Sequence, residues 1–146
     1  MTTNIKIAKV RPDAKIPTRG SDLAAGYDLY ACMDNDIVIK PHSTFKIRTG
    51  LSIQPPRGYF GAIFARSGLA TKQGLRPANC VGVCDEDYTG EYIVALHNDQ
   101  ECNWTIHSGD RIAQLIFLPY LTIDFEEVDH LDMTDRGENG FGSSGK

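Results

Sequence analysis

The sequence predicts an all-β fold, a β-sandwich or barrel of the jelly-roll type. Most of its apolar segments are short, rich in β-branched residues and alternate with polar residues. Clusters of turn residues separate these segments at intervals of about 8–12 residues, which is typical of sandwiches and barrels. No segment has a long apolar period of 3.6 residues, and this argues against helices packed on a parallel sheet.

The predicted strands follow one another along most of the chain. Seven segments alternate clearly, namely residues 5–10, 36–40, 44–53, 59–64, 91–97, 103–107 and 111–120. AGYDLYA predicts a further strand, and NCVGVCDEDYTGEY predicts a strand, a tight turn and a strand. SGLATKQG predicts the one short helix. We expect the last strand to end near Val128, so that a β core (1–128) precedes a flexible C-terminal arm (129–146) in a single domain (1–146).

The totals indicate a soluble globular protein. The chain has 146 residues, of which 41% are hydrophobic and 23% charged. A formal net charge of −4 argues against nucleic acid or a membrane as partner, so any polyanion must be held locally. The N-terminal residues lack the apolar core of a secretion signal, and we expect an intracellular protein, cytoplasmic by preference, with a nuclear or viral-host setting left open.

The cysteines do not follow a standard zinc pattern. In an intracellular protein we expect all four to be reduced. Cys80 and Cys84 lie in an apolar run, and free cysteine is commonly buried. The sequence therefore favours packing of both in the core over a metal site.

The last eleven residues, RGENGFGSSGK, combine glycines and serines with Arg136 and Phe141. Gly140, four residues and then Gly145-Lys146 make up most of a P-loop pattern. A P-loop, however, joins a strand to a helix and continues with Ser or Thr after the lysine. Neither condition is met, so we reject a P-loop.

Two stretches hold candidate ligand groups. Asp28 interrupts an apolar strand, either as an edge aspartate or as a carboxylate facing a ligand or a metal-bound water. In ARSGLA, Arg66, Ser67 and Gly68 open the short helix, where the helix dipole favours an anion. The alternative is an N-cap serine beside a solvated arginine.

The predicted hairpin carries three consecutive acids beside Tyr88. Gly82 permits another group to approach the backbone closely. Asp85 directly follows the apolar run VGVC, and a partly buried carboxylate there suits a general base acting on water. Glu86 and Asp87 complete the acidic stretch, and the alternative is that all three are solvated turn residues.

Gln114 is the polar exception in an apolar strand that starts after the GD turn. A buried amide needs a partner, which is either a ligand or the backbone. No Ser–His–Asp or Cys–His arrangement stands out, and the four histidines lie in or near turns. The simplest chemistry that these groups allow is activation of water by a carboxylate, directed at a magnesium-bound phosphate.

Together these stretches resemble the five ordered motifs of the trimeric deoxyuridine triphosphatase (dUTPase) family. AGYDL, ARSGLA, GVCDEDYTGE, GDRIAQLI and RGENGFGSSG occur in the family order from about residue 18 onward. The resemblance implies a jelly-roll homotrimer that uses Mg²⁺ to hydrolyse dUTP to dUMP and pyrophosphate at three sites, each shared by all three chains. Such an enzyme limits uracil incorporation into DNA and supplies dUMP for dTMP synthesis.

The resemblance also implies a role for each motif residue. Asp85 orients and deprotonates the water that attacks the α-phosphorus, and Tyr88 lies under the deoxyribose and excludes a 2′-hydroxyl. Asp28 binds Mg²⁺ through water. The uracil edge is read by Asn79, Gly82, Val83 and Cys84, and the phosphates are held by Arg66, Ser67, Gly68 and Gln114.

In the family the tail closes over a neighbouring site. Phe141 is then expected to stack on uracil, while the γ-phosphate is clasped by Arg136, Gly142, Ser143 and Ser144. The sequence departs from the family pattern at four positions, where Ala65 replaces proline, Cys84 isoleucine, Asn139 glycine and Ser144 threonine. None of these changes removes a group that the chemistry needs.

Two rival functions remain at this stage. The related deoxycytidine triphosphate deaminases share the fold, but they need a different polar set at the base and do not normally use this tail motif. A scaffold protein that kept the fold without catalysis is expected to have lost Asp85 or Arg136, and both are present.

Overall fold

The regular structure of the described residues is almost entirely antiparallel strand, with one short helix. The computed structural model describes residues 4–138. In this part of the chain lie β1 (Lys6–Lys9), β2 (Thr18–Arg19), β3 (Tyr27–Tyr30), β4 (Ile37–Ile39), β5 (Thr44–Gln54), β6 (Tyr59–Phe64), α1 (Ser67–Gln73), β7 (Leu75–Pro77), β8 (Gly82–Cys84), β9 (Glu91–Asn98), β10 (Trp104–Ile106) and β11 (Arg111–Pro119).

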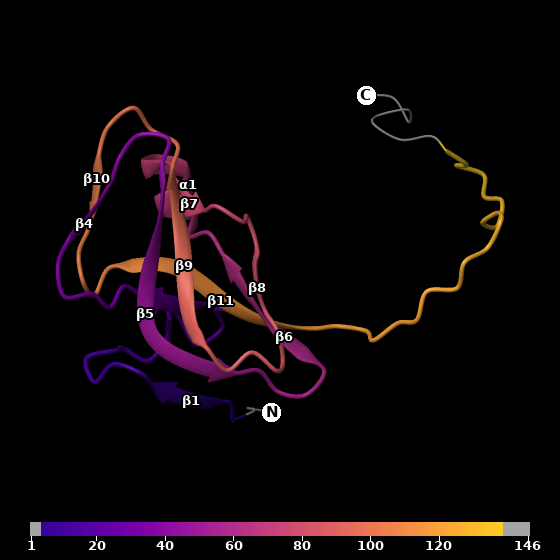
Figure 1. Cartoon of the computed structure of the whole chain (residues 1–146), viewed down its shortest axis with the longest axis horizontal. Coiled ribbons are helices and arrows are strands. Elements are labelled where there is room, and N and C mark those ends of the chain that lie inside the picture. Colours follow the sequence, from indigo (N-terminus) through magenta and orange to yellow (C-terminus); the bar gives the residue numbers. More distant parts are fainter. Residues whose placement is uncertain (1–3, 139–146) are drawn as a thin grey trace.

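The strands form two main sheets and one short ribbon. One sheet has the order β1-β5-β9-β7, the other has the order β2-β3-β11-β6-β8, and β10 pairs with β4. In Figure 1, β5 and β9 cross over β11. All neighbouring strands of the second sheet are antiparallel. Strands β3, β11 and β6 lie side by side in its middle.

The core lies between the two main sheets. Strand β9 alternates along most of its length, with Tyr92, Val94 and Leu96 at 0–1% exposure and the intervening side chains more exposed. Leu29 and Leu115 supply the facing side of the core from the second sheet. Alternation with a period of two residues is what a half-buried antiparallel strand requires, and it is the pattern that predicts these strands from sequence.

The observed elements confirm the all-β prediction and the one short helix. Strands β2 and β7 were not predicted, because they have only two and three residues and leave no alternation to detect. Both are edge strands, and β7 ends in a proline, which an edge tolerates. The prediction that the last strand ends near Val128 is wrong, since β11 ends at Pro119.

The segment from 120 to 138 leaves the two sheets and runs away from them (Figure 1). It contains neither helix nor strand, and its side chains are exposed, including Leu121 at 86% and Phe125 at 93%. We call residues 120–138 the arm, which therefore begins earlier than the sequence predicts. The described part holds no helix whose length and apolar character suit crossing a membrane.

Candidate active site

Asp28 and Gln114 face each other in the middle of the second sheet. Asp28 of β3 pairs with Gln114 of β11, and Gln114 pairs in turn with Phe64 at the end of β6. The amide nitrogen of Gln114 donates to the carbonyl of Ala65 at 2.8 Å. Gly26 lies so close that a Cβ there would sit 2.5 Å from the Gln114 side-chain oxygen. The backbone partner predicted as the alternative for Gln114 is thus present.

Two arginines converge on the Asp28 carboxylate. Arg66 Nε lies 2.9 Å from Oδ1, and Arg111 Nη1 lies 3.3 Å from Oδ2. The Asp28 side chain is 14% exposed, against 26% for Arg66 and 52% for Arg111. Two guanidinium groups against one carboxylate leave a local positive charge with N–H donors toward solvent, which suits a phosphate. We call Asp28, Arg66, Arg111 and Gln114 the cationic group.

Sequence reasoning missed Arg111. An arginine that opens a strand after a turn is normally a solvated residue, and nothing in GDRIAQLIF sets it apart. Only the pairing of β11 with β3 brings it to Asp28. The sequence does place Arg111 three residues before Gln114 on the same strand, and this was the one available indication of its role.

The start of helix α1 agrees with one of the two sequence interpretations and rules out the other. Arg66, with extended backbone at φ −82° and ψ 126°, is the N-cap residue and makes no side-chain capping bond. Ser67 is therefore the first helical residue, and the alternative of an N-cap serine beside a solvated arginine is wrong. Ser67 and Gly68 are exposed next to Arg66, so the hydroxyl and the first-turn N–H groups face solvent beside the cationic group.

The hairpin predicted for residues 79–92 is wrong, because β8 pairs with β6 whereas β9 pairs with β5 and β7 in the other sheet. We call residues 79–90 the β8 segment, and its glycines are closely packed. A Cβ at Gly82 would lie 3.2 Å from the Cβ of Ile63 and 3.3 Å from Asn79 Nδ2, so glycine lets the Asn79 amide rest against this backbone. Gly82 and Cys84 are buried, whereas Val83 between them is 61% exposed. Burial raises the pKa of the Cys84 thiol to about 11, which keeps it neutral.

Tyr88 lies across the turn that follows β8. Its hydroxyl donates to the carbonyl of Glu91 at 3.0 Å, and its ring centroid lies 6.2 Å from that of Tyr92. Gly90 leaves room for the ring, because a Cβ there would lie 2.5 Å from the Tyr88 hydroxyl. The Tyr88 N–H donates to the Asp85 carbonyl at 3.1 Å and closes the turn.

Two burial predictions for the β8 segment are wrong. Asp85 is exposed in the chain rather than partly buried. Cys80 is exposed rather than in the core, because it sits in a turn at φ 58° that interrupts the strand alternation. Cys84 is buried as predicted, and all four cysteines are free thiols.

The site residues fall into two groups that one chain does not bring together. Cys84 pairs with Gly61, which places Asp85 opposite Phe60, while Arg66 follows the far end of β6. At about 3.3 Å per residue, Phe60 and Arg66 are separated by roughly 20 Å.

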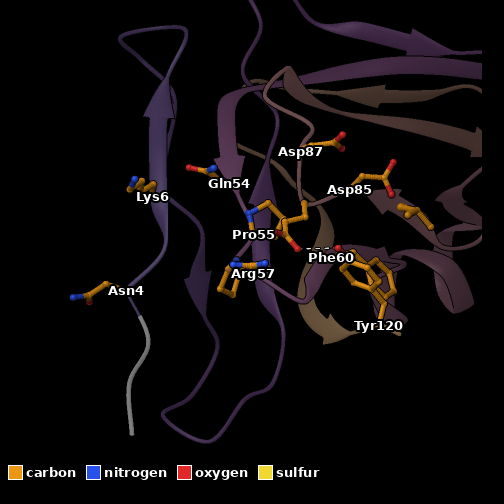
Figure 2. A pocket seen from close by; sticks show the side chains of 12 residues that line it. Asn4, Lys6, Gln54, Pro55, Arg57, Phe60, Asp85, Asp87 and Tyr120 are labelled. Carbon is orange, nitrogen blue, oxygen red and sulfur yellow. Dashed lines mark hydrogen bonds between the residues drawn. The ribbon is translucent and has the colours of Figure 1, made fainter. Parts of the chain in front are cut away.

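The two groups also border different cavities. Asp85 lines one of about 970 Å³ with Arg57, Phe60 and Tyr120 (Figure 2). Arg66 and Arg111 line another of about 370 Å³.

The tail residues divide between the described and the remaining parts of the chain. Arg136 lies at the end of the arm, in a turn where the Gly137 N–H donates to the Thr134 carbonyl at 3.0 Å. The other predicted tail residues lie outside the described residues, namely Phe141, Gly142, Ser143 and Ser144.

Comparison with known proteins gives one consistent result. A family model described as dUTPase matches residues 12–145. The deoxyuridine 5′-triphosphate nucleotidohydrolase of Desulfitobacterium hafniense (strain DSM 10664 / DCB-2) is 49% identical over 144 residues, which cover 97% of this chain and 95% of the relative. The Candida albicans protein of the same name is 44% identical over 147 residues, covering 99% and 90%.

A solved structure agrees with these relatives. The dUTPase of Staphylococcus bacteriophage 80alpha, solved with dUPNHPP, superposes with a TM-score of 0.90 at 27% identity, covering 99% of this chain and 100% of that one. The jelly-roll prediction is confirmed by this likeness. From its sequence, its fold and the arrangement of its motif residues, the chain belongs to the dUTPase family.

Proposed function

We propose that this chain is a dUTP diphosphatase that hydrolyses dUTP to dUMP and pyrophosphate through attack of water on the α-phosphorus. The observation that carries this proposal is the turn after β8, which Asp85 and Tyr88 flank in a chain of the dUTPase family. The reaction limits uracil incorporation into DNA and supplies dUMP for dTMP synthesis.

The active assembly is a homotrimer whose chains share each site. Support comes from the separation of the cationic group from Asp85, since a nucleoside triphosphate must contact both at once. The arm supports it too, because Leu121, Ile123 and Phe125 alternate along an exposed segment, as a strand needs in order to cover a neighbouring subunit. Closed threefold symmetry gives every chain the same donated and received parts.

In this assembly the β8 segment binds the nucleoside. The backbone of Gly82–Cys84 together with the Asn79 amide offers donors and acceptors to the uracil edge, and the exposed face of Tyr88 supports the deoxyribose. A 2′-hydroxyl is then excluded by contact with the tyrosine ring. The packing of that ring against Tyr92, with Gly90 beside it, gives it a fixed position.

The phosphates are held by Arg66, Gln114, Ser67 and Gly68, and we add Arg111. Mg²⁺ fits this place, because it is held in proteins by one or two carboxylates with waters and substrate phosphates rather than by a full cage of side chains. Asp28 is such a carboxylate, and each of its oxygens has one arginine donor and a further lone pair. When bound, Mg²⁺ neutralises charge on the triphosphate.

Asp85 activates the water. Its exposure in the single chain leaves the carboxylate accessible to a water and to a substrate bound between chains. The carboxylate takes a proton as the water oxygen attacks the α-phosphorus, and pyrophosphate leaves. Its other proposed contact is the 3′-hydroxyl of the sugar.

The tail completes the site of a neighbour. Phe141 stacks on uracil, and the γ-phosphate is clasped by Arg136, Gly142, Ser143 and Ser144. The exit of the arm away from its own sheets supports donation to another chain. Free thiols at all four cysteines and a nucleotide substrate fit an intracellular, cytoplasmic setting.

One substrate panel tests the function. The protein is incubated with dUTP, UTP, dTTP or dCTP and Mg²⁺, and pyrophosphate and ammonia are measured. We expect pyrophosphate from dUTP alone, and UTP cleavage to appear when Tyr88→Ala opens space at the sugar. Equal cleavage of dUTP and UTP by the unaltered protein contradicts the role of Tyr88. Ammonia released from dCTP identifies the deaminase instead.

A further inference from the structure

Glu86, the residue after Asp85, joins three segments that are distant in the sequence. Its Oε2 accepts the N–H of Gly58 at 2.7 Å and the hydroxyl of Tyr120 at 2.8 Å. Gly58 lies in the turn between β5 and β6, and Tyr120 directly follows β11 where the arm begins. The dashed line in Figure 2 marks the bond to Tyr120 beside the cavity that Asp85 lines.

The two donors are also bonded to each other. The Tyr120 N–H donates to the Gly58 carbonyl at 3.1 Å, which closes a ring of three hydrogen bonds around Glu86. Gly58 has φ 78°, a conformation that favours glycine, so this turn is built to present its N–H here. The Gly58 N–H, with the Tyr120 hydroxyl, lowers the pKa of Glu86, and bonds to such a charged acceptor are strong for hydrogen bonds.

Asp85 itself lacks comparable support. Within residues 4–138 no group donates a hydrogen bond to the Asp85 carboxylate, and its side chain is exposed. Its place is set by the backbone, through the bond from Tyr88 on one side and through Glu86 on the other. A shift of Glu86 therefore displaces the backbone of its neighbour Asp85, and the Asp85 carboxylate moves with it.

We propose that Glu86 is a positioning residue for the hydrolysis, whose carboxylate locks the turn carrying Asp85 to the β5–β6 turn and to the root of the arm. The inference rests on the proposed role of Asp85 as the base. Because the cationic group lies on other strands, loss of Glu86 leaves triphosphate binding in place and reduces turnover. If Glu86 is instead an ordinary solvated turn residue, its loss changes neither triphosphate binding nor turnover.

The test is steady-state hydrolysis of dUTP with Mg²⁺ by the full chain. In Glu86→Ala both bonds are lost, and we expect kcat to fall by about 10–100-fold, as for misplacement of a catalytic group by about 1 Å, with little change in KM. Glu86→Gln keeps an oxygen that accepts both bonds and recovers most of the kcat. The matched control is Glu101→Gln, which alters an exposed acid paired with His42 in the loop after β9 and keeps full activity.

Tyr120→Phe is the second probe, because it removes one bond and keeps the ring. It is expected to lower kcat by less than Glu86→Ala does. If thermal melting shows that Glu86→Ala does not fold, Tyr120→Phe alone tests the positioning role of Glu86. A wild-type kcat in Glu86→Ala or in Tyr120→Phe overturns the proposal. So does a Glu86→Gln variant as slow as Glu86→Ala, since charge rather than hydrogen bonding would then matter.

Asp85→Asn, measured in parallel, separates the two levels of inference. If this variant is inactive while Glu86→Ala is normal, only the role of Glu86 is lost. If Asp85→Asn retains wild-type turnover, the base is another group and Glu86 has no base to position.

Discussion

Substitution of Asp28 by asparagine tests the cationic group most directly. The amide keeps the size of the side chain and one acceptor oxygen, and it removes the charge that holds Arg66 and Arg111 together. The two guanidinium groups then repel each other across a largely buried position. We expect two separable effects, one on folding stability and one on the response to Mg²⁺.

The size of the stability effect follows from the exposure of each ion pair. The Arg66 bond is partly buried, and hydrogen bonds to charged groups contribute about 1.5–3 kcal/mol, of which the amide retains a part. Arg111 is half exposed, so solvent screening limits its pair to about 0–1 kcal/mol. The expected loss is about 1–3 kcal/mol of unfolding free energy, at about 2–4 °C of Tm per kcal/mol for a domain of this size.

The assay is thermal melting at fixed protomer concentration, followed by dUTP turnover across a Mg²⁺ titration. Fixed concentration matters because assembly shifts the apparent stability. Glu91→Gln is the matched control, since Glu91 is 12% exposed and pairs with Arg48 away from the cationic group. It is expected to lower the Tm and to leave the Mg²⁺ titration unchanged.

In Asp28→Asn the Mg²⁺ concentration for half-maximal rate is expected to rise. An unchanged Tm would show that the two ion pairs contribute nothing to folding. A Mg²⁺ titration that matches the Glu91→Gln control would remove Asp28 from the metal site.

Three further perturbations have clear expectations. Asp85→Asn is expected to lower turnover by about 10²–10⁴-fold. When its trimers are reassembled with those of inactive Arg66→Ala, about a quarter of the sites should regain activity if the two residues come from different chains. No recovery means that both residues of a site come from one chain. Tyr92→Phe removes a buried hydroxyl that lies near the Cys84 thiol and has no well-formed hydrogen bond in the described residues, so chemical denaturation should show equal or greater stability, and a loss would show that the contact with Cys84 is stabilising. Leu121→Ser with Phe125→Ser should lower the mass seen by light scattering at low concentration, because each apolar side chain contributes about 1.5–3 kcal/mol when buried by a neighbour; an unchanged mass places them outside the interface.

The predictable part of the fold is the part governed by alternation. Strand β9 shows why, because its apolar residues Tyr92, Val94 and Leu96 recur at every second position and are buried, although the outward residues Ile93 and Ala95 are apolar too. Cys80 shows the limit, since an apolar neighbourhood predicts burial but a backbone at φ 58° turns the residue outward. The prediction that the last strand ends near Val128 is wrong for a related reason. Residues 121–125 alternate as a strand does, yet within residues 4–138 no strand pairs with them.

The motifs single out some residues of the candidate site, whereas others emerge only from strand pairing. Asp28, Gln114 and Arg66 were predicted from their strands and helix, whereas Arg111 required the register of β11 against β3. Glu86 was predicted as one acid among three, and nothing in the sequence connects it with Gly58 or Tyr120. Contacts between segments far apart in the chain depend on the fold, and a local pattern does not contain them.

The separation of the cationic group from the β8 segment bears on the proposed role of the arm. If phosphates bind at one end of β6 and the nucleoside near the other, as proposed, one chain does not complete a site, because the two ends are separated by roughly 20 Å. Neighbouring chains remove this separation if the phosphate end of one meets the β8 segment of the next. The arm starts at Tyr120, bonded to the same Glu86 that adjoins Asp85. If the arm contacts a neighbouring chain as proposed, that contact is linked through the Glu86 carboxylate to the turn that carries the proposed base.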